Sequence, residues 1–299
     1  MIEGGRPARP WGRRIAAALL PCLLAACGTA EPGPQAQPAM WLVADADTRV
    51  YLLGTMHALP PGTDWDGGKV AGAIDSAGEL VMELAPGELA AAGEVFGELA
   101  PRATPLAIDA RLPQPALTRY RALEASGSDF GGDTLDDWAV VVLMAQRAAK
   151  NAGLSSSDGV EPGLTARFKA AGKPISGLET ARGQLMLFET LDPATQRTLL
   201  TRAAAGSDAA MQDIDTLVAA WTRGDVATLA AEINADIDAV PAARRAIVTE
   251  RNRRWTAWIA ARMARPGTVM VAVGTGHLVG TDSVPAMLEA AGTKVTRAQ

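Results

Sequence analysis

The chain contains two histidines, and each stands at the end of a Gly-Thr-x-His sequence. His57 ends the segment Gly54–His57, and His277 ends the segment Gly274–His277. Imidazole is the commonest metal ligand and the side chain that titrates closest to neutral pH. A lone histidine is more often structural than functional, but the repeated frame favours a shared role. The glycine in each frame allows a tight exit from a strand and a close approach by a ligand or backbone.

An apolar run precedes each of these frames and predicts a buried β-strand. The runs are Val50–Leu53 and Val269–Val273. In open α/β sheets, ligands bind beyond the carboxyl ends of the strands. The sequence therefore predicts that two imidazoles separated by 220 residues lie at the carboxyl ends of two strands.

Two glutamates follow apolar segments in the same way. Glu83 follows Leu80–Met82, and Glu179 follows Pro174–Leu178. A buried carboxylate needs a partner, and a metal ion is one. Two histidines and one carboxylate form a known catalytic zinc arrangement that also suits iron or manganese, and another glutamate could then act as general base. The simpler alternatives are a cap for the helix beginning near Pro86, in the case of Glu83, and a carboxylate near a helix N-terminus, in the case of Glu179.

The first 26 residues have the pattern of a secretion signal. Four arginines precede an apolar segment, 15–26, that is too short to span a bilayer permanently. The segment Leu24–Gly28 resembles a bacterial lipobox, which implies a diacylglyceryl anchor on Cys27; the alternative is an ordinary cleaved signal with an incidental cysteine. Gly28, rather than Asp, follows the cysteine, which favours sorting to the outer membrane. We therefore expect a lipid-anchored protein of the cell envelope that faces the periplasm.

The processed chain has no thiol available for catalysis, because Cys22 lies in the discarded segment and Cys27 would be acylated. Residues 27–39 read as a flexible tether, and 40–299 as the folded domain. Residues 1–26 hold four of the 28 basic and one of the 33 acidic side chains, which leaves a net charge of −8. Such an acidic balance argues against nucleic acid as a partner.

Predicted strands gather at both ends of the chain, with a largely helical middle. This order predicts an α/β fold with a mixed central sheet. Strands are expected over 41–43, 50–53, 80–82, 174–178, 269–273 and 294–296. Helices are expected over 68–77, 86–96, 113–126, 134–152, 161–171, 180–191, 193–204, 208–223, 225–236, 241–263 and 284–291.

Several segments in this order resemble the landmarks of the TraB/GumN family. They are Leu52–His57, the strand leading to Glu83, Gly172–Thr180, Glu250–Arg253 and Val273–Gly280. The resemblance runs from about Trp41 to Arg297. That family is similar to the animal Tiki proteins, membrane-anchored metalloproteases with two Gly-x-x-His motifs. The resemblance implies a fold similar to the erythromycin esterase and haem-binding ChaN group.

The resemblance also implies a set of site residues. Arg251 and Asn252 enter the set through it alone, since composition would make them solvated residues of a long helix. The full set is His57, Glu83, Glu179, Arg251, Asn252 and His277.

The expected function is a metal-dependent hydrolase, in particular a peptidase. His57, His277 and Glu83 would hold a divalent ion, Mn, Co or Zn, while Glu179 would move protons. Arg251 would stabilise the developing oxyanion. The expected substrate is a peptide or small molecule, and the membrane is contacted through the lipid anchor. Two alternatives remain open: a non-catalytic lipoprotein that binds haem or a small ligand, and a structural envelope protein with a vestigial site.

Overall fold

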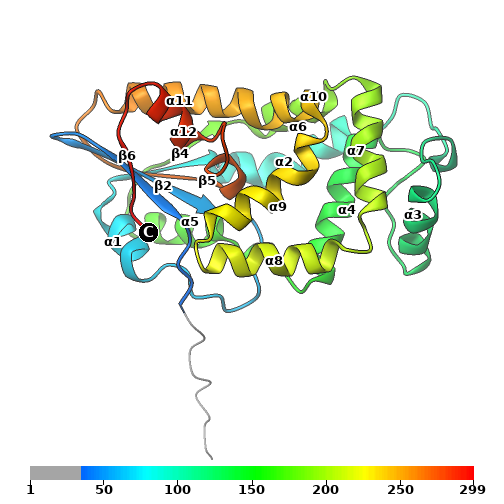
Figure 1. Ribbon diagram of the computed structural model, residues 1–299, viewed down its shortest axis with the longest axis horizontal. Coiled ribbons are helices and arrows are strands. Elements are labelled where there is room, and N and C mark those ends of the chain that lie inside the picture. The colour runs from blue at the N-terminus through cyan, green and yellow to red at the C-terminus, as the bar shows by residue number, and fades with distance from the viewer. Residues whose placement is uncertain (1–34) are drawn as a thin grey trace, which may run out of the picture. The chain divides into compact units, whose positions relative to one another are not determined.

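A computed structural model describes residues 35–299, apart from the side chains of residues 234–236. Its described part contains a six-stranded sheet with strands from both ends of the chain (Figure 1). In sheet order these are β4 (Ile175–Glu179), β3 (Glu79–Leu84), β5 (Gly267–Gly274), β2 (Thr48–Thr55), β1 (Met40–Ala44) and β6 (Val295–Arg297). The first four are mutually parallel, whereas β1 is antiparallel to β2 and β6. The predicted mixed α/β sheet is confirmed.

The strands that precede the two histidines are neighbours. β2 and β5 pair in parallel over their whole length, and Thr55 aligns with Gly274. Parallel neighbours end at the same edge of a sheet, so both Gly-Thr-x-His frames leave the sheet side by side. The carboxyl ends of β3 and β4 lie at this edge too, since these strands are parallel to β5.

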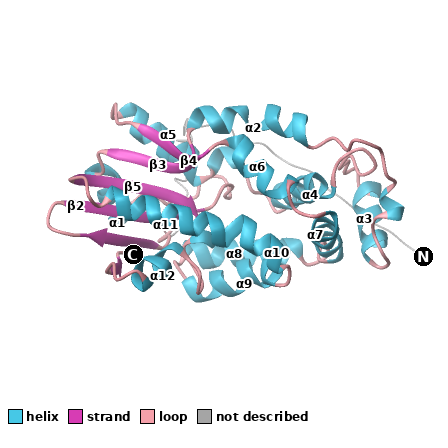
Figure 2. Ribbon diagram, turned by 90° about the horizontal axis from the view of Figure 1, so that it is seen from above, coloured by secondary structure: helices cyan, strands magenta, loops and turns pink. Residues whose placement is uncertain are grey.

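Helices cover both faces of the sheet and also form a separate group beyond its edge (Figures 1 and 2). The first part of the chain gives α1 (Gly68–Ser76), α2 (Pro86–Leu99), α3 (Ala116–Ala125), α4 (Asp137–Asn151) and α5 (Val160–Ala170). The later helices are α6 (Ala181–Glu189), α7 (Pro193–Ala205), α8 (Ala210–Thr222), α9 (Val226–Asp238), α10 (Pro241–Arg244), α11 (Glu250–Arg262) and α12 (Val284–Ala290).

Alternation along the central strand explains its continuous apolar run. Val269, Val271 and Val273 of β5 pack in a core with α11 and α12. Met270 and Ala272 point to the other face and pack in a core with α1 and α5. Successive strand residues face opposite sides, so a strand buried on both sides must be apolar throughout.

Helices α3, α4 and α7 pack on one another through a third core that contains Tyr120, Phe130 and Leu200. Beside it, Asp137 lies in the first turn of α4 and is nearly fully buried. Arg111 Nε donates to Asp137 Oδ1 at 2.7 Å, and Arg197 Nε donates to Asp137 Oδ2 at 2.5 Å. This buried ion cluster joins α4 to α7 and to the segment before α3.

The predicted long helix over 241–263 is interrupted. Residues 245–249 form a π-helical segment between α10 and α11. Such segments appear inside α-helices, frequently at functional sites, and the 3.6-residue apolar period does not reveal them. α4 begins at Asp137 rather than Thr134, and Glu83 and Glu179 lie within the last two residues of their strands rather than beyond them.

No helix in the described range is long and apolar enough to cross a bilayer. The predicted signal segment, Cys27 and most of the tether lie outside the described residues.

Candidate functional site

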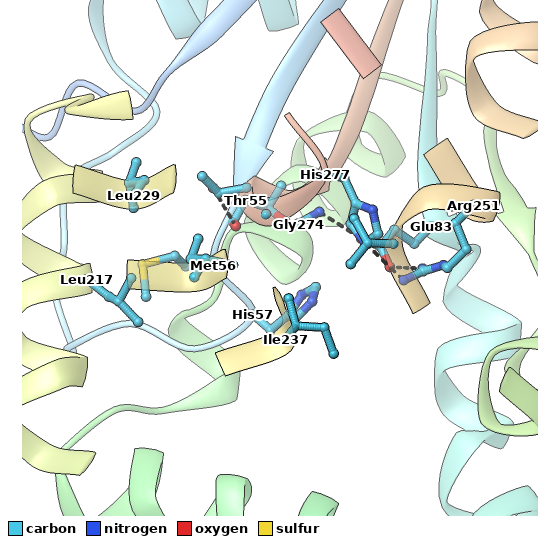
Figure 3. Close-up of a pocket in the computed structure, with 14 residues that line it drawn as sticks. Thr55, Met56, His57, Glu83, Leu217, Leu229, Ile237, Arg251, Gly274 and His277 are labelled. Carbon is cyan, nitrogen blue, oxygen red and sulfur yellow. Dashed lines mark hydrogen bonds and ion pairs between the residues drawn. The ribbon is translucent and has the colours of Figure 1, made fainter. Parts of the chain in front are cut away.

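A cavity of about 330 Å³ opens at the carboxyl edge of β2, β3 and β5 (Figure 3). Its polar floor holds both histidines, Glu83 and Arg251. Its other lining residues come from the ends of β2 and β5 and from α8, α9 and the π-helical segment: Thr55, Met56, Leu217, Leu229, Ile233, Ile237, Val248, Gly274, Thr275 and Gly276.

His57 is held by a carboxylate from α5. Its Nδ1 donates to Glu161 Oε1 at 2.8 Å, and the Thr55 hydroxyl donates to the same oxygen at 2.5 Å. The negative charge of Glu161 raises the pKa of His57 from 6.5 to about 9. The His57 side chain is 70% exposed, so solvent weakens the ion pair. With Nδ1 engaged, Nε2 is the nitrogen that faces the cavity.

His277 is held in a neutral form. Arg251 Nη1 donates to His277 Nε2 at 2.9 Å, so that nitrogen is the acceptor and Nδ1 carries the proton. His277 Nδ1 then donates to Asn252 Oδ1 at 2.7 Å. The Asn252 amide is fixed in turn, because its Nδ2 donates to the Asp282 carbonyl at 2.8 Å. Burial lowers the pKa of His277 to about 4, against the attraction of Glu83.

Glu83 is an ionised carboxylate with partners on both oxygens. The backbone N–H of Gly274 donates to Oε1 at 2.7 Å, and Arg251 Nη2 donates to Oε2 at 2.6 Å. Burial favours the neutral acid, but the charge of Arg251, together with His57 and the Gly274 N–H, lowers the pKa of Glu83 to about 2. The Gly274 contact ties the end of β3 directly to the frame that contains His277.

Glu179 and Gln184 complete a polar network around Arg251. Arg251 Nη2 donates to Glu179 Oε2 at 2.8 Å, and Arg251 Nε donates to Glu179 Oε1 at 3.1 Å. Gln184 Nε2 donates to both Glu83 Oε2, at 2.9 Å, and Glu179 Oε2, at 3.0 Å. The Trp255 ring packs 4.7 Å from the Arg251 guanidinium. The guanidinium is therefore fixed between two carboxylates and one imidazole.

Gly274 leaves a hollow at the centre of these groups. A Cβ on Gly274 would lie 3.1 Å from Glu83 Oε1, 3.6 Å from His57 Nε2 and 3.8 Å from His277 Cδ2. The two imidazoles and the carboxylate thus surround one small volume above a glycine. Their donor chemistry, two nitrogens and one carboxylate, fits a divalent transition-metal ion.

Arg251 lies where it limits access to that donor set. It occupies His277 Nε2 and one oxygen of Glu83. Among the side chains that the structure describes, no three His, Cys, Asp or Glu residues form a group that could hold a metal ion as they stand. A metal ion and a guanidinium repel each other, so metal binding would require Arg251 Nη1 to leave His277. Arg251 Nε also donates to both oxygens of Glu179.

The structure brings all six predicted site residues together at one end of the sheet, where His57 bonds to Glu161 and the other five are joined through Arg251 and His277. His57, Glu83 and His277 line the cavity itself, as does Arg251. Glu179 contacts Arg251, and Asn252 contacts His277. The composition-based expectation that Arg251 and Asn252 are solvated is wrong: they are 6% and 0% exposed, because the first turn of α11 faces the sheet edge.

Two further residues of the network were not expected from the sequence. Glu161 was an ordinary acidic residue in the first turn of a helix, and Gln184 was an unremarked position on α6. Acidic residues are common in first turns because they favour the helix dipole. A glutamate in that place therefore carries no separate signal that it contacts a histidine 104 residues away.

Comparison with known proteins gives one match. The model of the TraB/PrgY/gumN family matches residues 39–297, nearly the whole described domain. No curated protein and no solved structure matches the chain. The matched span contains every residue of the network described above.

Proposed function

The chain belongs to the TraB/PrgY/gumN family, and from this premise we propose that it is a metal-dependent hydrolase acting on peptides. The observation that supports the proposal is the convergence of His57 Nε2, the His277 ring and Glu83 Oε1 on the space above Gly274. These three side chains would hold the ion. When bound, a divalent ion supplies a Lewis acid and an activated water at neutral pH.

We propose different roles for Glu83 and Glu179. A general base works best with a pKa near the operating pH. Glu83 has a pKa of about 2 and so stays ionised as a ligand. Glu179 does not line the cavity but contacts Arg251, which does. Glu179 would accept or deliver protons. Arg251, which donates to Glu179, would stabilise negative charge that develops on a substrate oxygen.

Metal dependence can be tested on the purified protein after its metal has been removed with a chelator. Reloading with Mn²⁺, Co²⁺ or Zn²⁺ should give about one ion per chain, and a peptide library should then be cleaved only by the loaded protein. Binding of haem or a small ligand without any turnover would instead favour the non-catalytic alternative. A protein that binds neither metal nor ligand would contradict both.

Variants of the three donors separate the possible roles. His57→Ala and His277→Ala should each lose the metal and all hydrolysis while keeping the fold, judged by circular dichroism and melting temperature. Glu83→Gln should behave like them if Glu83 is a ligand. If Glu83 is the base, the variant should keep its metal and lose about 10²–10⁴-fold in rate. Glu94→Gln, on the exposed side of α2, is the control. Wild-type metal content in all three variants would show that the paired histidines are structural.

We also propose that Cys27 anchors the chain to the cell envelope through acyl groups, facing the periplasm. The support is the sequence Leu24–Gly28 after a basic, apolar leader. Cys27→Ser should release the protein from the membrane fraction or block processing, as seen by fractionation and intact mass. Unchanged fractionation and mass would contradict the anchor.

A further inference from the structure

A second, larger cavity of about 940 Å³ lies on the other side of His57. His57 lines both this cavity and the 330 Å³ cavity that holds the polar network. The second cavity lies between α4, the start of α5 and one residue of α2. An extended chain with a bond placed at the imidazoles would therefore have one cavity on each side of that bond.

Each cavity has apolar side chains on part of its wall. In the first cavity, the charged groups are confined to the floor, and α8 and α9 supply Leu217, Ile233 and Ile237. Figure 3 shows Leu217 and Leu229 on the side of this cavity opposite Arg251. The α8–α9 wall is held against the site, because Trp221 Nε1 donates to the Gly54 carbonyl at 2.9 Å.

The second wall contains Leu89, Ala145, Ala149, Leu154 and Pro162. Leu89 is 50% exposed, one of few large apolar side chains in the described chain that solvent reaches to this degree. Leu89 is thus accessible to an apolar side chain of a ligand bound in this cavity. Gln146, Lys150, Ser155 and Ser156 also line this cavity and can contact the backbone of a bound chain.

From these features we infer that the cleft selects extended peptide segments with apolar side chains on both sides of the cleaved bond. One side chain would lie under α8 and α9, and the other against Leu89 and α4. This inference rests on the proposed peptidase function for its catalytic part, but the binding part can be tested without turnover. A well-filled apolar subsite discriminates by about 10–200-fold for each methylene it accepts or lacks.

The binding test uses metal-free protein and two fluorescent peptides of equal length. One has leucine at each position flanking the central bond, and the other has serine there. Fluorescence anisotropy should show at least about tenfold tighter binding of the leucine peptide. Single leucine-to-serine changes should each remove part of the difference.

Paired variants then assign each side chain to a wall. Ile237→Gln should weaken selection on one side of the bond only, and Leu89→Gln on the other side only. The controls are Ala231→Gln on α9 and Ala90→Gln on α2, which are exposed positions outside the two cavities. None of the four substitutions changes the charge of the protein, so the electrostatic field at His57, Glu83 and His277 is little altered.

The outcomes separate this inference from the proposed function. If the leucine peptide binds more tightly but metal-loaded protein cleaves no peptide, the apolar cleft is supported and the proposed peptidase function is contradicted. Cleavage with no preference for apolar residues, or equal binding of the two peptides, would contradict the inference that the cleft selects apolar side chains. Equal losses in the control variants would overturn it as well.

Discussion

The two imidazoles are held by opposite kinds of partner. A carboxylate, Glu161, accepts the proton of His57 Nδ1, which favours the charged ring. An amide, Asn252, accepts the proton of His277 Nδ1, while Arg251 donates to its other nitrogen and favours the neutral ring. In the neutral form of each ring, the proton is therefore on Nδ1 and the lone pair is on Nε2. Such partners orient metal-binding histidines and tune their basicity.

The metal-free protein should therefore show two well-separated histidine titrations. The pKa of His57 should lie above 6.5, toward 9, and that of His277 below 6.5, toward 4. His57 stabilises the fold below pH 6.5 and loses this contribution as pH rises through its raised pKa; His277 costs stability as pH falls from 6.5 toward 4. Nitrogen-15 NMR can follow both rings, because the chain has two histidines, and His57→Ala assigns the signals. Two titrations near 6.5 would contradict the described contacts.

Removal of the Glu161 charge should weaken metal binding through His57. Glu161→Gln removes the carboxylate that holds Nδ1 and should lower metal affinity by about 10–100-fold, the usual effect of changing such a partner. The pKa of His57 should fall at the same time, which a purely structural role would not cause. Isothermal titration and NMR measure the two effects, and Glu161→Asp tests rescue. Unchanged affinity and an unchanged pKa would exclude a positioning role.

The sequence alone identified those site residues that follow a recognisable strand. His57, Glu83, Glu179 and His277 were identified because each follows an apolar strand, and strand ends meet at one edge of a parallel sheet. Arg251 and Asn252 came from family resemblance, since an arginine-rich helix reads as solvated. Glu161 and Gln184 gave no signal, because their partners are about a hundred residues away in the chain.

At the scale of elements, apolar runs predicted the strands well and helix interruptions poorly. The six strands and most helices lie within a few residues of their predicted positions. The π-helical segment at 245–249 was missed because periodicity averages over several turns. That segment immediately precedes the turn carrying Arg251 and Asn252, so its extra residue affects which side chains of α11 face the site.

Stability of the helices beyond the sheet should depend on one buried carboxylate. Asp137→Ala would leave Arg111, buried at its side chain, and Arg197 without their shared partner. Breaking such a pair by removing one member costs about 3–5 kcal/mol. Urea unfolding should show this loss, whereas Asp215→Ala, an exposed position on α8, should change the free energy of unfolding by less than about 0.5 kcal/mol. Equal effects of the two variants would contradict the importance of the cluster.

Strands from the two ends of the described chain pair with each other in the same sheet. β2 near the N-terminus pairs with β5 near the C-terminus, and β6 closes against β1. Residues between them return through β3 and β4 to supply Glu83 and Glu179. A ligand held by His57, Glu83 and His277 would thus bridge segments that are far apart in sequence. Binding at this place should stabilise the whole domain rather than one loop.

Metal loading should accordingly raise the free energy of unfolding, and its removal by chelator should reverse the change. At a free metal concentration a hundred times the dissociation constant, the expected gain is about 2.7 kcal/mol. Gly274→Ala is the matched control: its φ of −50° is open to alanine, but the added methyl group would lie 3.1 Å from Glu83 Oε1 and fill the hollow between the imidazoles. The variant should fold, melt without metal close to the wild type, and gain little stability on metal addition. Calorimetry with and without metal measures both proteins. An equal metal-induced shift in the two would place the ion away from Gly274, and the donor set derived from the paired histidines would then be wrong.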